Sequence, residues 1–269
     1  MQTKMQNGQD KNRFGRHLAL AFTAGALVVS TLMTPQGAQA ASTCDHEGKI
    51  WVNKYFLHNN KWGQGSGSGW NCLWNNNNSS PISWGTSFNW TGNANTVKAY
   101  PSCVLGWHWG TWSNNSGLPT RIWDNKNLNT GWNFSVTGNN RLNVSYDLWF
   151  HTMSNPTWQN NPSDEIMVWL YKTGNIYPAG SYQHDVSIAG TNWELWKGTV
   201  DTWNVYSFVR KSNTTSATMN LRDFIHYVVY TKKWMKNDKF LTSVQSGPEI
   251  FTTSGEGKVD TSSYYCNVQ

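Results

Sequence analysis

The chain has 269 residues and a formal net charge of +6, from 21 Lys and Arg against 15 Asp and Glu. The first 40 residues carry four of the basic side chains and one acidic one, so the remainder has 17 basic and 14 acidic residues, a net charge of +3. This remainder has no run of Lys and Arg, so the sequence lacks the electrostatic signature of a nucleic-acid-binding protein.

The first 40 residues have the pattern of a secretory signal peptide. Four basic residues precede an apolar run over residues 18–33, and Ala38-Gln39-Ala40 is a small-residue cleavage site. The apolar run is short for a membrane span, which weighs against an uncleaved anchor. We therefore predict a secreted monomer whose single domain covers residues 41–269 and has no membrane attachment after cleavage.

All four cysteines follow the predicted cleavage site, and export leads to an oxidising compartment in which disulfides persist. Four cysteines allow three pairings. We favour a Cys44–Cys72 bridge near the N-terminus, with Cys103 and Cys266 as the remaining pair. No C-x-x-C pair occurs and no pair of histidines lies near a cysteine, so we predict no metal and no cofactor.

After the signal, short β-type segments are separated by Gly, Asn and Pro. In chain order the strand candidates are residues 49–58, 96–100, 141–150, 164–170, 182–188, 191–200, 204–209, 240–251 and 262–268. Turns are predicted at residues 59–60, 65–69, 75–81, 137–140, 174–175 and 190–191. Many strands at short spacing, with no βαβ rhythm, predict an all-β jelly-roll sandwich of two curved antiparallel sheets.

One segment departs from this pattern. Between residues 219 and 236, apolar side chains recur with the 3.6-residue period of a helix. Asn220 is placed to cap the start of this helix. We predict one amphipathic α-helix that packs on the outer face of a sheet.

The segment 164–170 has the alternation of a strand, whose successive side chains point to opposite faces. One face is wholly apolar, with Ile166, Val168 and Leu170. The other face carries Glu165, Met167 and Trp169. A carboxyl group in line with a thioether and an indole indicates the floor of a groove for a flat, polar ligand.

Two other acids share a strand face with an aromatic residue, Asp147 with Trp149 and Glu249 with Phe251. All 18 Trp follow the predicted cleavage site, and indoles beside Asn, Gln and Tyr suit sugar rings, which have apolar faces and hydroxyl edges. Paired carboxyl groups are what glycoside hydrolysis requires. One protonates the leaving oxygen, and the other attacks the anomeric carbon or activates water.

Other chemistries fit the sequence less well. No H-E-x-x-H or comparable metal-binding spacing of histidines occurs, and there is no G-x-S-x-G motif. No phosphate-binding Gly-rich loop opens a helix. The residues themselves thus favour a carbohydrate-active protein with three acids in one groove.

With these features the chain resembles glycoside hydrolase family 12, the small β-jelly-roll endoglucanases and xyloglucanases. The matching stretches follow the family order over nearly all of the chain after the signal: residues 59–63, 97–102, 145–149, 164–170, 178–181, 204–208 and 247–251. Residues 106–109 and 119–121 look like the bacterial branch. The resemblance implies endo-acting, retaining hydrolysis of β-1,4-glucosidic bonds in cellulose, mixed-linkage glucan or xyloglucan.

Carried over position by position, the resemblance makes Glu165 the nucleophile and Glu249 the acid/base. Asp147 matches the residue that lies close to the nucleophile and helps to hold its protonation state. The other matches are the methionine beside the nucleophile and positions that line the cleft: Met167, Trp62 with Asn60 in the glycone half, Trp169, and Pro178. Phe251, which shares a strand face with Glu249, completes the predicted substrate-binding set.

The resemblance also shows two departures. Cys44 and Cys72 have the spacing of the family's N-terminal disulfide, whereas Cys103 and Cys266 have no counterpart. Pro248 stands where the family usually has Thr, which removes a hydroxyl and a backbone N–H beside Glu249.

Two alternatives remain open at this stage. A non-catalytic carbohydrate-binding module or lectin would explain the Trp content, although it has no need of paired acids. A related jelly-roll xylanase would share the architecture and the two acids, but the E-x-M-x-W motif fits it less well. The preferred glucan stays open, because it depends on the loops 63–69, 75–81 and 152–162.

Overall fold

The computed structural model describes residues 40–269, which belong to one compact unit. Residues 1–39 of the predicted signal peptide, all but its last residue, lie outside the described residues. Among the described residues there is no helix with the length and apolar character that a membrane crossing requires.

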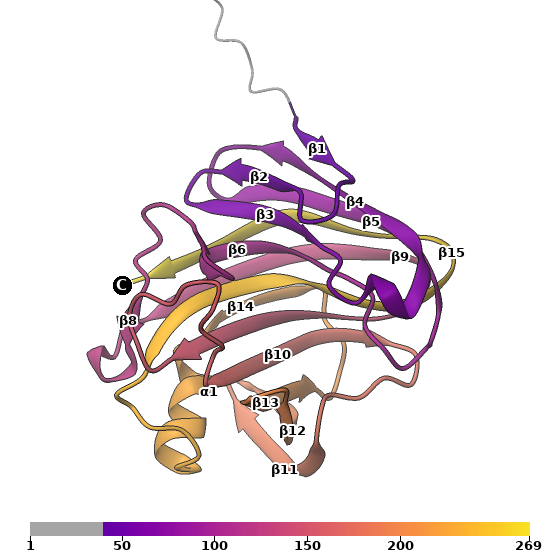
Figure 1. The fold of residues 1–269 in the computed structure, drawn as a ribbon. Coiled ribbons are helices and arrows are strands. Elements are labelled where there is room, and N and C mark those ends of the chain that lie inside the picture. The colour runs from indigo at the N-terminus through magenta and orange to yellow at the C-terminus, as the bar shows by residue number, and fades with distance from the viewer. Residues whose placement is uncertain (1–39) are drawn as a thin grey trace, which may run out of the picture. The chain divides into compact units, whose positions relative to one another are not determined.

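The described residues are mostly β-strand (Figure 1). The strands are β1 (Ser42–Thr43), β2 (Lys49–Val52), β3 (Tyr55–Asn60), β4 (Gly67–Asn77), β5 (Ile82–Gly92), β6 (Tyr100–His108), β7 (Thr111–Trp112), β8 (Thr120–Arg121), β9 (Leu128–His151), β10 (Asp164–Thr173), β11 (Ser181–Ile188), β12 (Thr191–Val200), β13 (Trp203–Arg210), β14 (Ser216–Asn220) and β15 (Phe240–Val268). The helical segments are η1 (Gln64–Ser66), η2 (Ile122–Asp124), α1 (Arg222–His226) and η3 (Tyr227–Thr231).

The strands form two layers that share the long strands β9 and β15. The first layer runs β2-β3-β6-β15-β9-β10-β13-β12-β11, and the second runs β1-β4-β5-β15-β9-β14. Buried side chains from both layers, such as Leu57 on β3 and Phe88 on β5, belong to one hydrophobic core. The predicted jelly-roll sandwich is confirmed, except that β10 and β13 pair in parallel and not antiparallel.

The alternation predicted for residues 164–170 is confirmed in β10. Ile166, Val168 and Leu170 lie in the main core. Met167 and Trp169 lie on the opposite face, in a second apolar cluster. This opposite face of the first layer, which also carries Glu165, is called the acid face below.

The predicted helix is present but shorter than residues 219–236. It begins at Arg222 and ends at Thr231, with its second half in the wider π form. Met219 and Asn220 belong to β14, because their backbone pairs with β9. The ring centroid of Phe224 lies 5.1 Å from that of Trp193 on β12, and both residues belong to the main core. The helix therefore packs on the core side of the first layer and not, as predicted, on an outer face, because its apolar residues extend the core between the layers.

Several strand boundaries differ from the prediction. The segment 49–58 is a hairpin, β2 and β3, broken at Asn53, whose φ of 55° reverses the chain. Strands β4 and β5 were not predicted, and the predicted turn at residues 137–140 lies inside β9.

The first predicted disulfide, Cys44–Cys72, is present. The predicted Cys103–Cys266 bridge is wrong. Cys103 lies on β6 in the first layer and Cys266 on the second-layer half of β15, and both are free, buried thiols. The hydroxyl of Tyr55 reaches the backbone at Cys266 and accepts a hydrogen bond from its N–H (2.9 Å).

Candidate active site

Strand β9 lies between the two strands that carry Glu165 and Glu249. Asp147 on β9 is opposite Met167 on β10 and opposite Gln245 on β15. Residues that are directly opposite on neighbouring strands project to the same face, as do residues two or four apart on one strand. Glu165, Asp147 and Glu249 therefore all belong to the acid face, as the alternation predicted.

Glu165 is buried, with 6% of its surface exposed. Its Oε2 accepts a hydrogen bond of 2.7 Å from the indole N–H of Trp203, the first residue of β13. Burial raises the pKa of Glu165 to about 7, and the hydrogen bonds from Trp203 and Asp147 act in the opposite direction. These two donors favour the ionised carboxylate form of Glu165.

Asp147 is buried directly beside Glu165. Burial, followed by the negative charge of Glu165, raises the pKa of Asp147 well above the usual range for an aspartate. Asp147 therefore takes up a proton before Glu165 does. In its neutral form it donates the hydrogen bond that the two carboxyl groups share.

Glu249 has different surroundings. Its Oε2 accepts a hydrogen bond of 2.6 Å from the side-chain amide of Asn143, its partner on β9. Burial raises the pKa of Glu249 to about 7, Asn143 opposes this shift, and the negative charge of Glu165 adds to it. As long as Glu165 is ionised, its charge favours the protonated, acidic form of Glu249.

Pro248 fits beside Glu249 because its missing N–H points away from β9. Ser246 is paired with Cys103, and Ile250 with Ala99, so the same register places Pro248 opposite Pro101 on β6. Neither proline has an N–H, and the ladder between β6 and β15 is interrupted at this point. The pairing of Glu249 with β9, which holds its carboxyl group, is untouched.

Of the predicted substrate-binding residues, three form one apolar cluster on the acid face: Met167, Trp169 and Phe251. Pro178 is buried in the loop between β10 and β11. Trp62 lies after the end of β3 with 60% of its surface exposed, and its backbone N–H donates to the side-chain oxygen of Asn60 (3.1 Å).

Three residues that contact or surround the acids were not identified from the sequence. Trp203 and Asn143 donate the hydrogen bonds described above, and the buried Tyr100 has its pKa raised well above the usual range by burial and by the charges of Asp147 and Glu249. One signal was available for Asn143, because it lies four residues before Asp147 and so shares its strand face.

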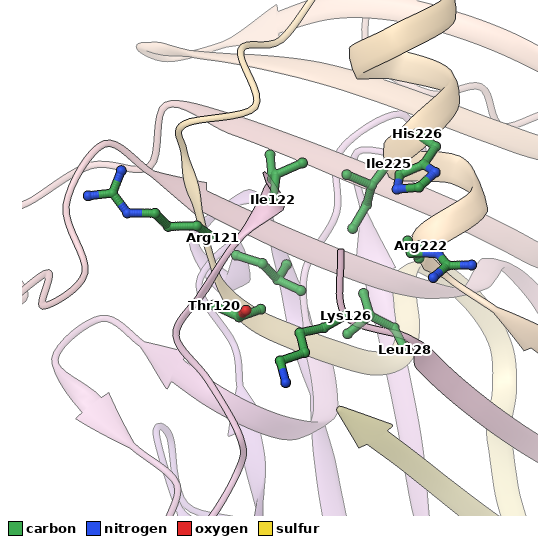
Figure 2. A pocket seen from close by; sticks show the side chains of 9 residues that line it. Thr120, Arg121, Ile122, Lys126, Leu128, Arg222, Ile225 and His226 are labelled. Atoms are coloured by element: carbon green, nitrogen blue, oxygen red, sulfur yellow. The ribbon is translucent and has the colours of Figure 1, made fainter. Parts of the chain in front are cut away.

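A small pocket of about 20 Å³ lies elsewhere, between the helix and the start of β15 (Figure 2). None of the three acids lines it, since its walls are formed by Thr120, Arg121, Ile122, Lys126, Leu128, Arg222, Ile225, His226 and Leu241. We assign it no part in the chemistry of the acids.

Comparisons with known proteins identify the family of the chain. The family model for glycosyl hydrolase family 12 matches residues 53–268. Endoglucanase S from Pectobacterium parmentieri is 38% identical over 91% of this chain and 94% of its own. A probable xyloglucan-specific endo-β-1,4-glucanase A from Aspergillus terreus is 31% identical over 93% of this chain and 97% of its own. The solved family 12 xyloglucanase from Bacillus licheniformis is 39% identical, with a TM-score of 0.80 over 85% of this chain and 100% of its own. The chain therefore belongs to glycosyl hydrolase family 12.

Proposed function

We propose that this protein hydrolyses internal β-1,4-glucosidic bonds of β-glucans with retention of the anomeric configuration, with Glu165 as nucleophile and Glu249 as acid/base. Endo-β-1,4-glucan hydrolysis is supported by family membership and by the activities in the names of the relatives. The observation that carries the assignment of residues is the pair of acids on one face, Glu165 buried and Glu249 partly buried, each with its own hydrogen-bond donor.

In the first step, Glu165 attacks the anomeric carbon of a glucosyl unit while Glu249 gives its proton to the leaving oxygen. The bond between the anomeric carbon and that oxygen breaks, and a covalent glycosyl-enzyme forms. The N–H of Trp203 and the O–H of Asp147 favour the ionised form of Glu165 before the attack.

In the second step, Glu249 removes a proton from a water molecule, which attacks the anomeric carbon and releases Glu165. The geometry supports this change of role. Once Glu165 is esterified it has no negative charge, so one of the causes that raises the pKa of Glu249 disappears. The pKa of Glu249 falls, and the carboxylate becomes available as a base.

We extend the proposal to the predicted binding residues. Trp62 offers an exposed indole face for stacking on a sugar ring, and Asn60 holds its backbone. We assign Met167, Trp169 and Phe251, which form the apolar cluster on the acid face, and Pro178, in the loop after β10, to the walls of the binding cleft. We also propose that residues 1–40 are removed on export, leaving a secreted, monomeric single-domain enzyme over residues 41–269.

The test is a substrate panel of carboxymethyl cellulose, barley β-glucan, xyloglucan and xylan, with release of reducing ends as the measurement. We expect wild type to cleave at least one β-1,4-glucan, and Glu165→Gln and Glu249→Gln to lose at least about 100-fold in kcat. Glu256→Gln, at an exposed position of β15, is the matched control and keeps full activity. Near-full activity in either active-site variant would overturn the assignment, and binding without any cleavage would favour a lectin.

The export proposal has its own measurement. Amino-terminal sequencing of the protein from culture medium should begin near Ala41. Mass determination by light scattering should give a single chain.

A further inference from the structure

Asp147 belongs to a row of residues that lie opposite one another on successive strands, and this row reaches the edge of the first layer at β11. Met167 lies opposite Asp147 on β10, and Ser207 on β13 lies opposite Met167. Trp196 on β12 lies opposite Ser207, and Tyr182 on β11 lies opposite Trp196. Because opposite residues project to the same face, the row from Asp147 to Tyr182 lies on the acid face.

The row is longer than one sugar. Strand β11 is the fourth strand from β9, in the order β9-β10-β13-β12-β11. Four steps of about 4.8 Å give about 19 Å between Asp147 and Tyr182 along the row. A sugar bound at Tyr182 is therefore not the glucosyl unit whose bond is broken. It is a unit further along a glucan that crosses the strands.

Three aromatic rings gather at this end of the row. The ring centroid of Trp196 lies 5.7 Å from that of Tyr177 and 6.0 Å from that of Tyr182. Tyr177 is 60% exposed and Tyr182 is 50% exposed. Trp196 packs on the apolar cluster that contains Met167, so apolar surface continues from beside the nucleophile to these rings.

The rings are held in place by the protein itself. Gly180 has a φ of 90°, and a Cβ added there would lie 2.0 Å from the carbonyl oxygen of Lys197, so the loop that carries Tyr177 lies directly against β12. The indole N–H of Trp196 donates to Glu194 (3.3 Å), and the hydroxyl of Tyr182 donates to Asp185 (3.1 Å). Little ordering of these side chains is required when a ligand binds.

We propose that Tyr177, Tyr182 and Trp196, the rim platform, form a sugar-stacking subsite for an outer β-1,4-linked glucosyl unit of the chain that is cleaved. Exposed aromatic faces bordered by hydroxyl and carboxyl groups match the apolar faces and hydroxyl edges of sugar rings. Trp62, after β3, lies on the opposite side of β9 in the strand order. The platform thus extends substrate binding in the other direction from Trp62. The inference rests on the proposed function.

The test compares substrates of different length in Tyr177→Ala, Tyr182→Ala and the double variant. The measured quantity is kcat/KM on cellohexaose divided by kcat/KM on cellotriose. We expect this ratio to fall about two- to tenfold for each ring removed, because only the longer chain reaches the platform. The matched control is Tyr230→Ala, since Tyr230 is 48% exposed on η3, on the core side of the layer, and this variant keeps the wild-type ratio.

A second readout requires no turnover. In a Glu165→Gln background, the migration of the protein through a gel that contains barley β-glucan reports binding alone. We expect retardation to weaken with Tyr177→Ala and Tyr182→Ala and to stay with Tyr230→Ala. The platform would be overturned if the double variant kept the wild-type ratio of kcat/KM values and the wild-type retardation while the parent enzyme was active. The proposed function would then still stand. A parent enzyme that cleaves no glucan would overturn both.

Discussion

Replacing Trp203 with Phe tests the most direct electrostatic contact in the site. The substitution keeps an aromatic ring beside Trp149, whose ring centroid lies 5.4 Å away, but removes the N–H that donates to Glu165 Oε2. Because this donor lowers the pKa of Glu165, its loss raises that pKa above the present value of about 7. Glu165 then requires a higher pH to be ionised, so the acidic limb of the pH–rate profile moves upward.

The size of the shift follows from the geometry. The bond is short, 2.7 Å, and it ends on a carboxylate that is 6% exposed, so little water is available to replace it. A hydrogen bond to a charged group contributes about 1.5–3 kcal/mol, and one pKa unit corresponds to about 1.4 kcal/mol. The acidic limb should therefore move by about one to two pH units.

The assay is the pH dependence of kcat/KM on a soluble β-glucan, since this parameter reports the ionisation of the free enzyme. Activity lost at low pH should return on the alkaline side of the new limb. Trp51→Phe, at an exposed indole on β2, serves as the control and keeps the wild-type profile. An acidic limb that stays in place in Trp203→Phe would refute the role given to this hydrogen bond.

The remaining predictions concern the second acid and the stability of the fold. Asn143→Leu removes the donor to Glu249, so the pKa of Glu249 rises and the basic limb of kcat/KM moves up by about one pH unit; an unchanged basic limb would contradict the acid/base assignment. A Cys44→Ser and Cys72→Ser double variant, which opens a link between residues 28 apart in sequence, should lose about 3–4 kcal/mol in the free energy of unfolding measured in urea. Lys239→Met leaves the buried Asp164 without its ion-pair partner and should cost about 3–5 kcal/mol in the same measurement, whereas Lys236→Met, at an exposed position, should change it little.

The acids themselves could be predicted from the sequence, but most of the side chains that tune them could not. Alternation along one strand is a local property, so it places Glu165, Met167 and Trp169 on one face without knowledge of any neighbour. The donor to Glu165 comes from β13, which pairs in parallel with β10, and no local pattern encodes that pairing or its register. Trp203 therefore becomes visible only in three dimensions.

Strand β4 of the second layer was not predicted, for a different reason. In β4, two positions that face the interior are Asn71 and Asn75, which are buried although they are polar. Asn71 accepts a hydrogen bond from the indole N–H of Trp90 (3.2 Å) and donates one to Asn59. Buried amides that satisfy each other remove the apolar alternation on which strand prediction depends. The sequence therefore predicts turns at residues 65–69 and 75–81 and no strand between them.

The helix shows the same limit at its start. The apolar period of residues 219–236 correctly predicts the helix and the face that packs on the sheet. Its first two residues instead satisfy their backbone groups against β9, at Thr130 and Asn129. Pairing with a distant strand outweighed the local periodicity.

The strands that carry Asp147 and Glu249 also build the layer opposite them. Strand β9 runs for 24 residues and β15 for 29, and they remain paired from one layer into the other. The strands that carry the acids therefore cannot unfold as a separate unit, because separating β9 from β15 disrupts both layers of the sandwich. Backbone amides near Asp147 and Glu249 should exchange hydrogen only through global unfolding, and thermal inactivation should coincide with the loss of tertiary structure.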